Sequence, residues 1–160
     1  MLGVAMNLHV RRLRATLDRL FTNHIDLSDC KTRPQSQQES AFLTRSLGAY
    51  ALTMAADIEP RVAAASIVDG FDDNGLDAIY VNKDEKRVYV VQAKWDKSGS
   101  GGFELGDIHK FLQGFRDLVE TRFNRFNSRV RAMQAVIRMA VPEALTRFPQ
   151  SILGLLPGLG

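Results

Sequence analysis

Apolar residues return at near-helical spacing along the first part of the chain, at Leu8, Val10, Leu13, Leu17 and Leu20. Arginines occupy much of the remaining surface of this segment, so the pattern predicts an amphipathic helix that ends near Asn23. Residues 26–34 show no periodicity and contain Asp, Ser, Cys, Thr and Pro, a composition typical of a connector. A second helix is predicted over residues 37–56.

The rest of the chain mixes strand and helix patterns. In chain order they predict a short strand (64–68), an acidic loop (69–75), a hairpin (75–95), a glycine-rich loop (97–102), two helices (108–119 and 126–137) and a buried strand (151–156). The hairpin prediction is the strongest of these, because two apolar runs flank the polar turn at residues 82–87.

This hairpin places polar side chains of different chemistry side by side. Side chains alternate between the two faces of a strand, so Gln92 and Lys94 share one face. If Val81 pairs with Val88, Asp77 lies opposite Gln92, and directly opposed Cβ atoms are about 5 Å apart. The pattern therefore predicts a carboxylate, an amide and an amine on one face. A slip of one residue would separate them.

Two short motifs carry a resemblance to a known family: Gly-Leu-Asp-Ala-Ile at residues 75–79 and Gln-Ala-Lys at residues 92–94. With the hairpin between them they resemble the PD-(D/E)XK nuclease superfamily. More narrowly, they resemble its Gln-x-Lys branch, found in Mrr-type restriction endonucleases and in the N-terminal domain of abortive infection phage resistance proteins. The resemblance covers about residues 36–120. Leu76 stands in place of the Pro, and Gln92 replaces the second acid, which removes one negative charge from the site.

The resemblance implies an α/β fold with a restriction-endonuclease-like core. Such a core has a central mixed sheet of about four strands flanked by helices, and the N-terminal helix would be an addition to it. We expect residues 1–35 to form this helix and its connector, and residues 36–160 to form the core. Because a candidate core strand lies at the C-terminal end, we expect the core to be truncated there and the protein to be part of a longer chain.

The resemblance also implies roles for the hairpin residues. Asp77 would bind Mg²⁺ or Mn²⁺, and the Gln92 amide oxygen and the Ala93 carbonyl would be further ligands, since such ions prefer oxygen. Lys94 would orient or deprotonate the attacking water and stabilise charge developing on the phosphate.

Glu39 allows two interpretations of equal weight. It matches the position at which the family's first helix often supplies an acid to the metal site. It also occupies the third helical position of a capping box that would begin at Ser36. Glu39 falls in one helical stripe with Leu43 and Met54, which predicts that its carboxylate lies on the face that packs inward.

Three acids in the predicted loop, Asp69, Asp72 and Asp73, fail the spacing of a calcium-binding EF-hand loop. We expect them to form a solvated turn, with Asp69 as an outside candidate for the metal.

Arg122, Arg125 and Arg129 predict a basic stripe on one helix, since residues 122–139 contain no acid. Such a face can bind phosphates without sequence preference, and a merely solvated face is an equal alternative. Gln113 could lean toward the same phosphates, although a solvated helical glutamine is the favoured interpretation.

Composition narrows the function classes. The chain has 160 residues, enough for one core, and a formal net charge of +3 that is compatible with a polyanionic partner. Its one cysteine, Cys30, excludes an internal disulfide and a thiolate metal cluster. No stretch is as long and apolar as a membrane span, so a cytoplasmic location is the default.

We therefore expect a Mg²⁺-dependent endonuclease that acts on DNA, with a role in restriction or anti-phage defence. DNA is the expected partner, and a homodimer is left open. The alternative is a non-catalytic nucleic-acid-binding or protein-interaction module on the same fold. Retention of Lys94 beside Asp77 favours the enzyme.

Overall fold

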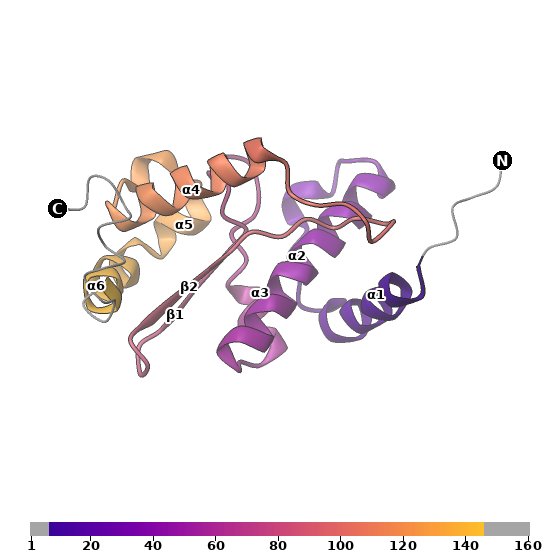
Figure 1. The fold of residues 1–160 in the computed structure, drawn as a ribbon, viewed down its shortest axis with the longest axis horizontal. Coiled ribbons are helices and arrows are strands. Elements are labelled where there is room, and N and C mark those ends of the chain that lie inside the picture. Colours follow the sequence, from indigo (N-terminus) through magenta and orange to yellow (C-terminus); the bar gives the residue numbers. More distant parts are fainter. Residues whose placement is uncertain (1–6, 146–160) are drawn as a thin grey trace.

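The computed structural model describes residues 7–145 of the chain, and Figure 1 shows how the elements are arranged. In order they are α1 (Leu8–Phe21), the 3-10 helix η1 (Ser28–Cys30), α2 (Gln35–Ala56), α3 (Pro60–Ala65), β1 (Ala78–Asn82), β2 (Arg87–Val91), α4 (Leu105–Val119), the 3-10 helix η2 (Phe123–Arg125), α5 (Ser128–Ala132) and α6 (Gln134–Leu145). The fold is thus a mixture of helices and strands, and the predicted helices at the N-terminus agree with α1 and α2.

Strands β1 and β2 form the predicted antiparallel hairpin. The register pairs Val81 with Val88 and Ile79 with Val90, which confirms the predicted pairing within the strands. The strands are shorter than the apolar runs suggested, since β2 ends at Val91. Gln92 and Lys94 therefore lie beyond the end of the ladder.

The hairpin lies between two hydrophobic clusters, one against each of its faces. The first cluster joins α1, α2 and α3 to one face, where Ala78, Tyr80, Tyr89 and Val91 are packed. The second joins α4, α5 and α6 to the other face, where Ile79, Val81, Val88 and Val90 are packed. Because side chains alternate along a strand, each cluster receives every second residue. Helices α1–α3 and α4–α6 accordingly flank the hairpin from two sides (Figure 1).

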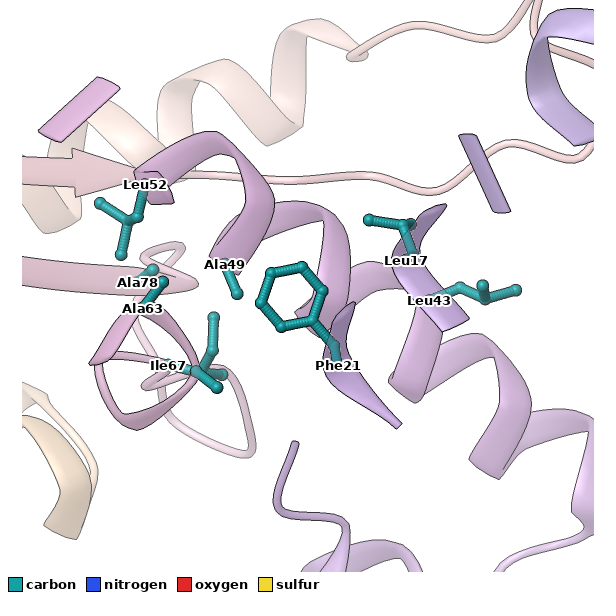
Figure 2. Packing of buried hydrophobic residues seen from close by; sticks show 9 residues of the cluster. Leu17, Phe21, Leu43, Ala49, Leu52, Ala63, Ile67 and Ala78 are labelled. Atoms are coloured by element: carbon teal, nitrogen blue, oxygen red, sulfur yellow. The ribbon is translucent and has the colours of Figure 1, made fainter. Parts of the chain in front are cut away.

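The first cluster fixes α1 against α2. Figure 2 shows Leu17 and Phe21 of α1 beside Leu43 and Ala49 of α2, and all four are buried. Phe21 is fully inaccessible to solvent, and burying such a side chain contributes on the order of 2–3 kcal/mol.

The predicted strand at residues 64–68 is wrong. A proline at the first helical position, Pro60, begins α3, because its fixed φ suits that position and its missing N–H has no partner there. The alanines that follow are strong helix formers. Only Ile67 pairs with Ala78, as an isolated bridge.

The sheet found among residues 7–145 has two strands, so the expected sheet of about four strands is not seen in this part of the chain. The predicted buried strand at 151–156 lies outside the described residues. The single helix expected over 126–137 is interrupted. Asn127 accepts a hydrogen bond from the Val130 N–H and begins α5, and α6 starts only at Gln134.

Helix α4 docks on the acidic loop through a glycine. A Cβ atom on Gly114 would lie 2.0 Å from the Asn74 carbonyl oxygen, so only glycine allows this approach. We expect Gly114→Ala to lower the free energy of unfolding by about 1–3 kcal/mol, because the helix and the loop must move apart.

Gly106 is the matched control, since it lies in the same helix and a Cβ there would meet nothing within 4 Å. We expect Gly106→Ala to be neutral or stabilising by up to about 1 kcal/mol, because alanine favours the helix. Urea denaturation of both variants measures the difference. Equal unfolding midpoints for Gly114→Ala and the wild type would contradict the close approach.

Candidate metal centre

In the structure the predicted acidic loop extends to residue 77, so we call residues 69–77 the acidic loop, which connects the end of the α3 region to β1. Asp72, Asn74 and Gly75 have positive φ values of 58°, 56° and 79°, a conformation that aspartate, asparagine and glycine tolerate better than other residues. Asn127 holds this loop in place from the other half of the molecule. Its side-chain amide donates to the Val68 carbonyl at 2.8 Å, and its backbone N–H donates to the Asp72 carbonyl at 2.9 Å.

The loop brings three carboxylates together. Asp69, Asp73 and Asp77 each place one carboxylate oxygen within 4.8 Å of the other two. We call these three residues the acidic cluster. The expectation of a solvated turn is wrong for Asp73, which is buried. Its Oδ1 accepts from the Gly75 N–H at 2.8 Å and pairs with Lys110 Nζ at 3.3 Å.

Within the acidic cluster, Asp77 has a carboxyl group whose pKa is strongly raised. Its side chain is buried, and Oδ2 accepts a hydrogen bond of 2.5 Å from the Ala93 N–H. Burial raises the pKa of this carboxyl to about 7, and the negative charges of Asp69 and Asp73 add to the rise. The Ala93 N–H and the Lys110 ammonium oppose it without cancelling it. A buried acid among acids is the electrostatic setting that a bound cation relieves.

Gln92 and Lys94 turn toward the beginning of α4. Gln92 Nε2 donates to the Asp107 carbonyl at 3.3 Å, and Lys94 Nζ pairs with Asp107 Oδ2 at 2.8 Å. The Lys94 amine is about half exposed, and its hydrogen bond with Asp107 raises its pKa. The two side chains thus reach one common residue. No hydrogen bond within residues 7–145 joins either of them to the acidic cluster, and the predicted convergence with Asp77 stays a prediction.

The first turn of α4 connects these two groups of residues. Asp107 forms a capping box with Glu104 and an ion pair with Lys94. Lys110, about one turn further along the helix, forms an ion pair with Asp73. Asp107 and Lys110 were missed in the sequence because their partners are distant in the chain. Asp73 had an available signal, namely the regular four-residue spacing from Asp69 to Asp73 to Asp77.

Glu39 has a different partner. Its Oε1 accepts from the Arg14 guanidinium of α1, and Glu39 is not a member of the acidic cluster. The predicted capping box is wrong, because α2 begins two residues earlier, after Pro34, and its N-cap makes no side-chain hydrogen bond. The inward stripe is also interrupted, since Met54 is exposed although Leu43 is buried. A metal-binding role for Glu39 remains a prediction, and it would require the carboxylate to give up its ion pair with Arg14.

The predicted arginine stripe does not form on one helix. Arg122 and Arg125 belong to the short η2 region, and both approach Asp117 of α4, at 2.8 and 3.3 Å. Asp117 is fully buried and also accepts from Asn74 and from Gln113 Nε2. Burial alone would raise the pKa of Asp117, but these donors hold it below its ordinary value. Gln113 thus helps to satisfy a buried carboxylate, and phosphate binding by Arg122 and Arg125 stays a prediction.

The third arginine of the predicted stripe, Arg129, belongs to an ionic network built around a buried arginine. It pairs with Asp26 at 3.0 Å and Asp29 at 3.5 Å, in the connector between α1 and α2. At the centre is Arg45, whose side chain is 2% exposed. Its guanidinium makes two hydrogen bonds to Asp29 and one to Asp69 Oδ2 at 2.6 Å. The predicted connector therefore supplies two carboxylates of this network, those of Asp26 and Asp29.

The network and the acidic cluster share one residue, Asp69. Burial would lower the pKa of Arg45, but its hydrogen bonds with Asp29 and Asp69 raise it well above its usual value. The Arg45 hydrogen bonds likewise hold the pKa of Asp29 far below its usual range. The Arg45 Nε–H donates to Asp69 Oδ2 and so fixes the orientation of this carboxylate.

We expect Arg45→Met to lower the free energy of unfolding by about 2–3 kcal/mol, because removing one member of a buried ionic network leaves its partners uncompensated. This loss lies below the value of about 3–5 kcal/mol typical of a fully buried pair, since Asp29 is about one-third exposed. Arg87→Met is the control: the Arg87–Glu85 pair is exposed, and we expect a change within about 0.5 kcal/mol. Chemical denaturation distinguishes the two, and similar losses would mean that the network contributes no more than a surface pair.

None of the helices in the described part of the chain combines the length and the apolar character needed to cross a membrane. Comparison of the chain with known proteins finds no matching family model, no matching curated protein and no matching solved structure. The functional argument therefore depends on the residues and their geometry.

Proposed function

We propose that this domain is a divalent-metal-dependent nuclease that hydrolyses phosphodiester bonds of DNA, with a role in restriction or anti-phage defence. The single observation that carries the proposal is the convergence of Asp69, Asp73 and Asp77 within 4.8 Å, beside the segment 92–94, whose central backbone N–H donates to Asp77. The sequence motifs at residues 75–79 and 92–94 support the same activity through their resemblance to the PD-(D/E)XK superfamily.

The donor set fits Mg²⁺ or Mn²⁺. Hard divalent cations are bound in proteins by one or two carboxylates together with water and substrate oxygens. Asp77 and Asp69 each have one carboxylate oxygen engaged in a hydrogen bond, and within residues 7–145 the other oxygen of each is not so engaged. Asp73 is partly neutralised by Lys110. Asp77 and Asp69 would therefore be the principal ligands, and the Gln92 amide and Ala93 carbonyl would be secondary ones.

A bound divalent cation would supply polarisation of the attacking water and of a phosphate oxygen. The remaining work falls to the protein. The Asp107 contact raises the pKa of Lys94, which favours its charged form over a role as a base. Lys94 would therefore donate a hydrogen bond to a phosphate oxygen and stabilise the negative charge that develops there. For this it must exchange its contact with Asp107 for one with the substrate.

The rival function, a non-catalytic binding module, has one observation in its favour. The Lys94 amine is paired with Asp107 and not with a member of the acidic cluster. A domain that only binds nucleic acid would have no need to bring this lysine to a metal ion.

Cleavage of plasmid and single-stranded DNA decides between the two functions. The wild type should cut in the presence of Mg²⁺ or Mn²⁺, and EDTA or Asp77→Asn should abolish the reaction. Calorimetric titration with Mn²⁺ should show binding to the wild type that Asp77→Asn loses. Metal binding without cleavage of either substrate would support the rival, and absence of metal binding would remove the basis of the proposal.

A further inference from the structure

Phe71, in the acidic loop, is 86% exposed, more than any other large apolar side chain among residues 7–145. An aromatic ring that is left in water contributes nothing to the core, and such exposure is informative when the ring is held in place. Phe71 stands between two members of the acidic cluster, two residues after Asp69 and two before Asp73.

The backbone on both sides of Phe71 is fixed. Asn127 donates to the carbonyls of Val68 and Asp72, which bracket the ring in sequence. The Gly70 N–H donates to Asp73 Oδ2 at 3.4 Å, and the Leu76 N–H donates to the Asp73 carbonyl at 3.2 Å. The loop therefore presents the ring from a supported base, so little order would have to be gained on binding.

The ring separates two polar hollows, and it lines both. One hollow, of about 470 Å³, lies against α2 and contains Arg33, Gln37 and Thr44. The other, of about 510 Å³, lies against η2 and α5 and contains Arg125 and Arg131.

The charges in these hollows leave arginines available. In the first hollow Asp29 and Asp69 are bound to Arg45, and Arg33 has no ion pair with any acid of residues 7–145. In the second hollow Arg125 is paired with Asp117, and the remaining charged residues of its lining are Arg131 and Asp72, which form no ion pair with each other. Among residues 7–145 no ion pair joins Arg33 or Arg131 to an acid.

We propose that Phe71 and the two hollows form a binding site for single-stranded nucleic acid. An unpaired base stacks on the Phe71 ring, and the phosphates on either side of it enter the hollows, where Arg33 and Arg131 bind them. A duplex cannot use this arrangement, because its bases are stacked on one another and do not offer a free face to a protruding ring. The site deepens the proposed nuclease function and rests on it for its biological meaning, since it would bring a single strand to the loop that bears the acidic cluster.

Binding is tested without cleavage, in EDTA, by the fluorescence anisotropy of a labelled oligothymidylate with the full chain. We expect Phe71→Ala to weaken binding by roughly 5- to 150-fold, the loss that removal of one base–aromatic stack produces. Phe71→Trp should restore binding, because indole offers a larger stacking face. Phe103→Ala is the matched control, since Phe103 is also an exposed ring and lines neither hollow.

The arginines are tested through the salt dependence of the same binding. Arg33→Gln and Arg131→Gln should each flatten the slope of log K against log salt by about 0.7, the value for one lost phosphate contact on a single strand. Arg138→Gln should leave the slope unchanged, because Arg138 of α6 is stacked over Phe123 outside both hollows.

The outcomes separate this proposal from the nuclease itself. Single strands that bind through Phe71 without being cut would support the site and count against the nuclease. Equal binding by the wild type and Phe71→Ala, or binding of duplex as tightly as single strands, would overturn the site even if cleavage is found. A uridylate oligonucleotide measured in parallel shows whether RNA is bound as well. The site is supported if Phe71→Ala weakens binding of the DNA strand, whether or not the RNA strand also binds. Unchanged circular dichroism confirms that each variant is folded.

Discussion

Replacing Asp77 with asparagine should make the metal-free protein more stable at about pH 8, although it removes the residue on which the proposed activity depends most. The reason is the raised pKa of this carboxyl, about 7 in the folded protein against an ordinary value of 3.8. Such a rise corresponds to on the order of 4 kcal/mol of destabilisation when the group is ionised. An amide keeps the size of the side chain and can still accept from the Ala93 N–H, but it carries no charge.

The sign of the pH dependence follows from proton binding. Between the two pKa values the folded protein holds more protons at this site than the unfolded chain does, so the free energy of unfolding falls as the pH rises. For the wild type in EDTA we expect a loss of about 2–3 kcal/mol between about pH 5 and about pH 8. Asp77→Asn should remove that slope and exceed the wild type by roughly 2–4 kcal/mol at the upper pH.

Asp84→Asn is the control, because Asp84 is exposed in the turn between the strands. Urea titrations of the three proteins across this pH range measure the effect. A wild type that is most stable at the alkaline end would mean that Asp77 is ionised without penalty. If Asp77 is a metal ligand, added Mg²⁺ or Mn²⁺ should raise the free energy of unfolding of the wild type at about pH 8 and leave that of Asp77→Asn unchanged. An ion that binds only the folded protein stabilises it.

Lys94→Ala should abolish cleavage while leaving folding and DNA binding almost unchanged. In the proposed reaction Lys94 acts on charge that develops in the transition state, and removing one such stabilising group costs about 3 kcal/mol, or roughly a hundredfold or more in rate. Binding should change little, because Lys94 is one of 21 lysines and arginines. The exposed Asp107 contact gives no reason to expect a large loss of stability.

Lys97→Ala is the control for the loss of one positive charge close to the site, since Lys97 is exposed in the loop that follows. Single-turnover cleavage with saturating enzyme separates the chemical step from binding. If Lys94→Ala and Lys97→Ala cut as fast as the wild type, the measured activity belongs to a contaminant or the site lies elsewhere. Asp107→Asn adds a sharper test. It should release Lys94 from its partner and so leave cleavage intact or increase it.

Local sequence patterns were enough to predict the hairpin and the first two helices. The register from Val81–Val88 to Ile79–Val90 followed from a polar turn between apolar runs, because the turn length fixes the pairing. The same reasoning failed at Ala64–Val68. A short apolar segment does not distinguish a strand from a helix, and Pro60 together with the alanines after it decided for α3.

The candidate site could be predicted only in part, because its charges are arranged by packing between distant segments. Asp77 was proposed from its place just before the first strand of the hairpin, whereas Asp73 is buried and pairs with Lys110, 37 positions further along the chain. Residues 122–139 contain no acid, yet Arg122 is paired with Asp117 and Glu120, which precede that stretch. Arg129 meets Asp26 across 103 positions of the chain, and no local pattern contains that information.

The position of the hairpin between two clusters has a consequence for how the chain folds. Each cluster needs one face of the same two strands, so neither half of the sequence can complete its interior alone. We therefore expect a single cooperative transition without a stable half-folded intermediate. Trp95, the one tryptophan, is packed against the cluster of α1–α3, so its fluorescence reports on that side, and it should change at the same denaturant concentration as the circular dichroism of the whole chain.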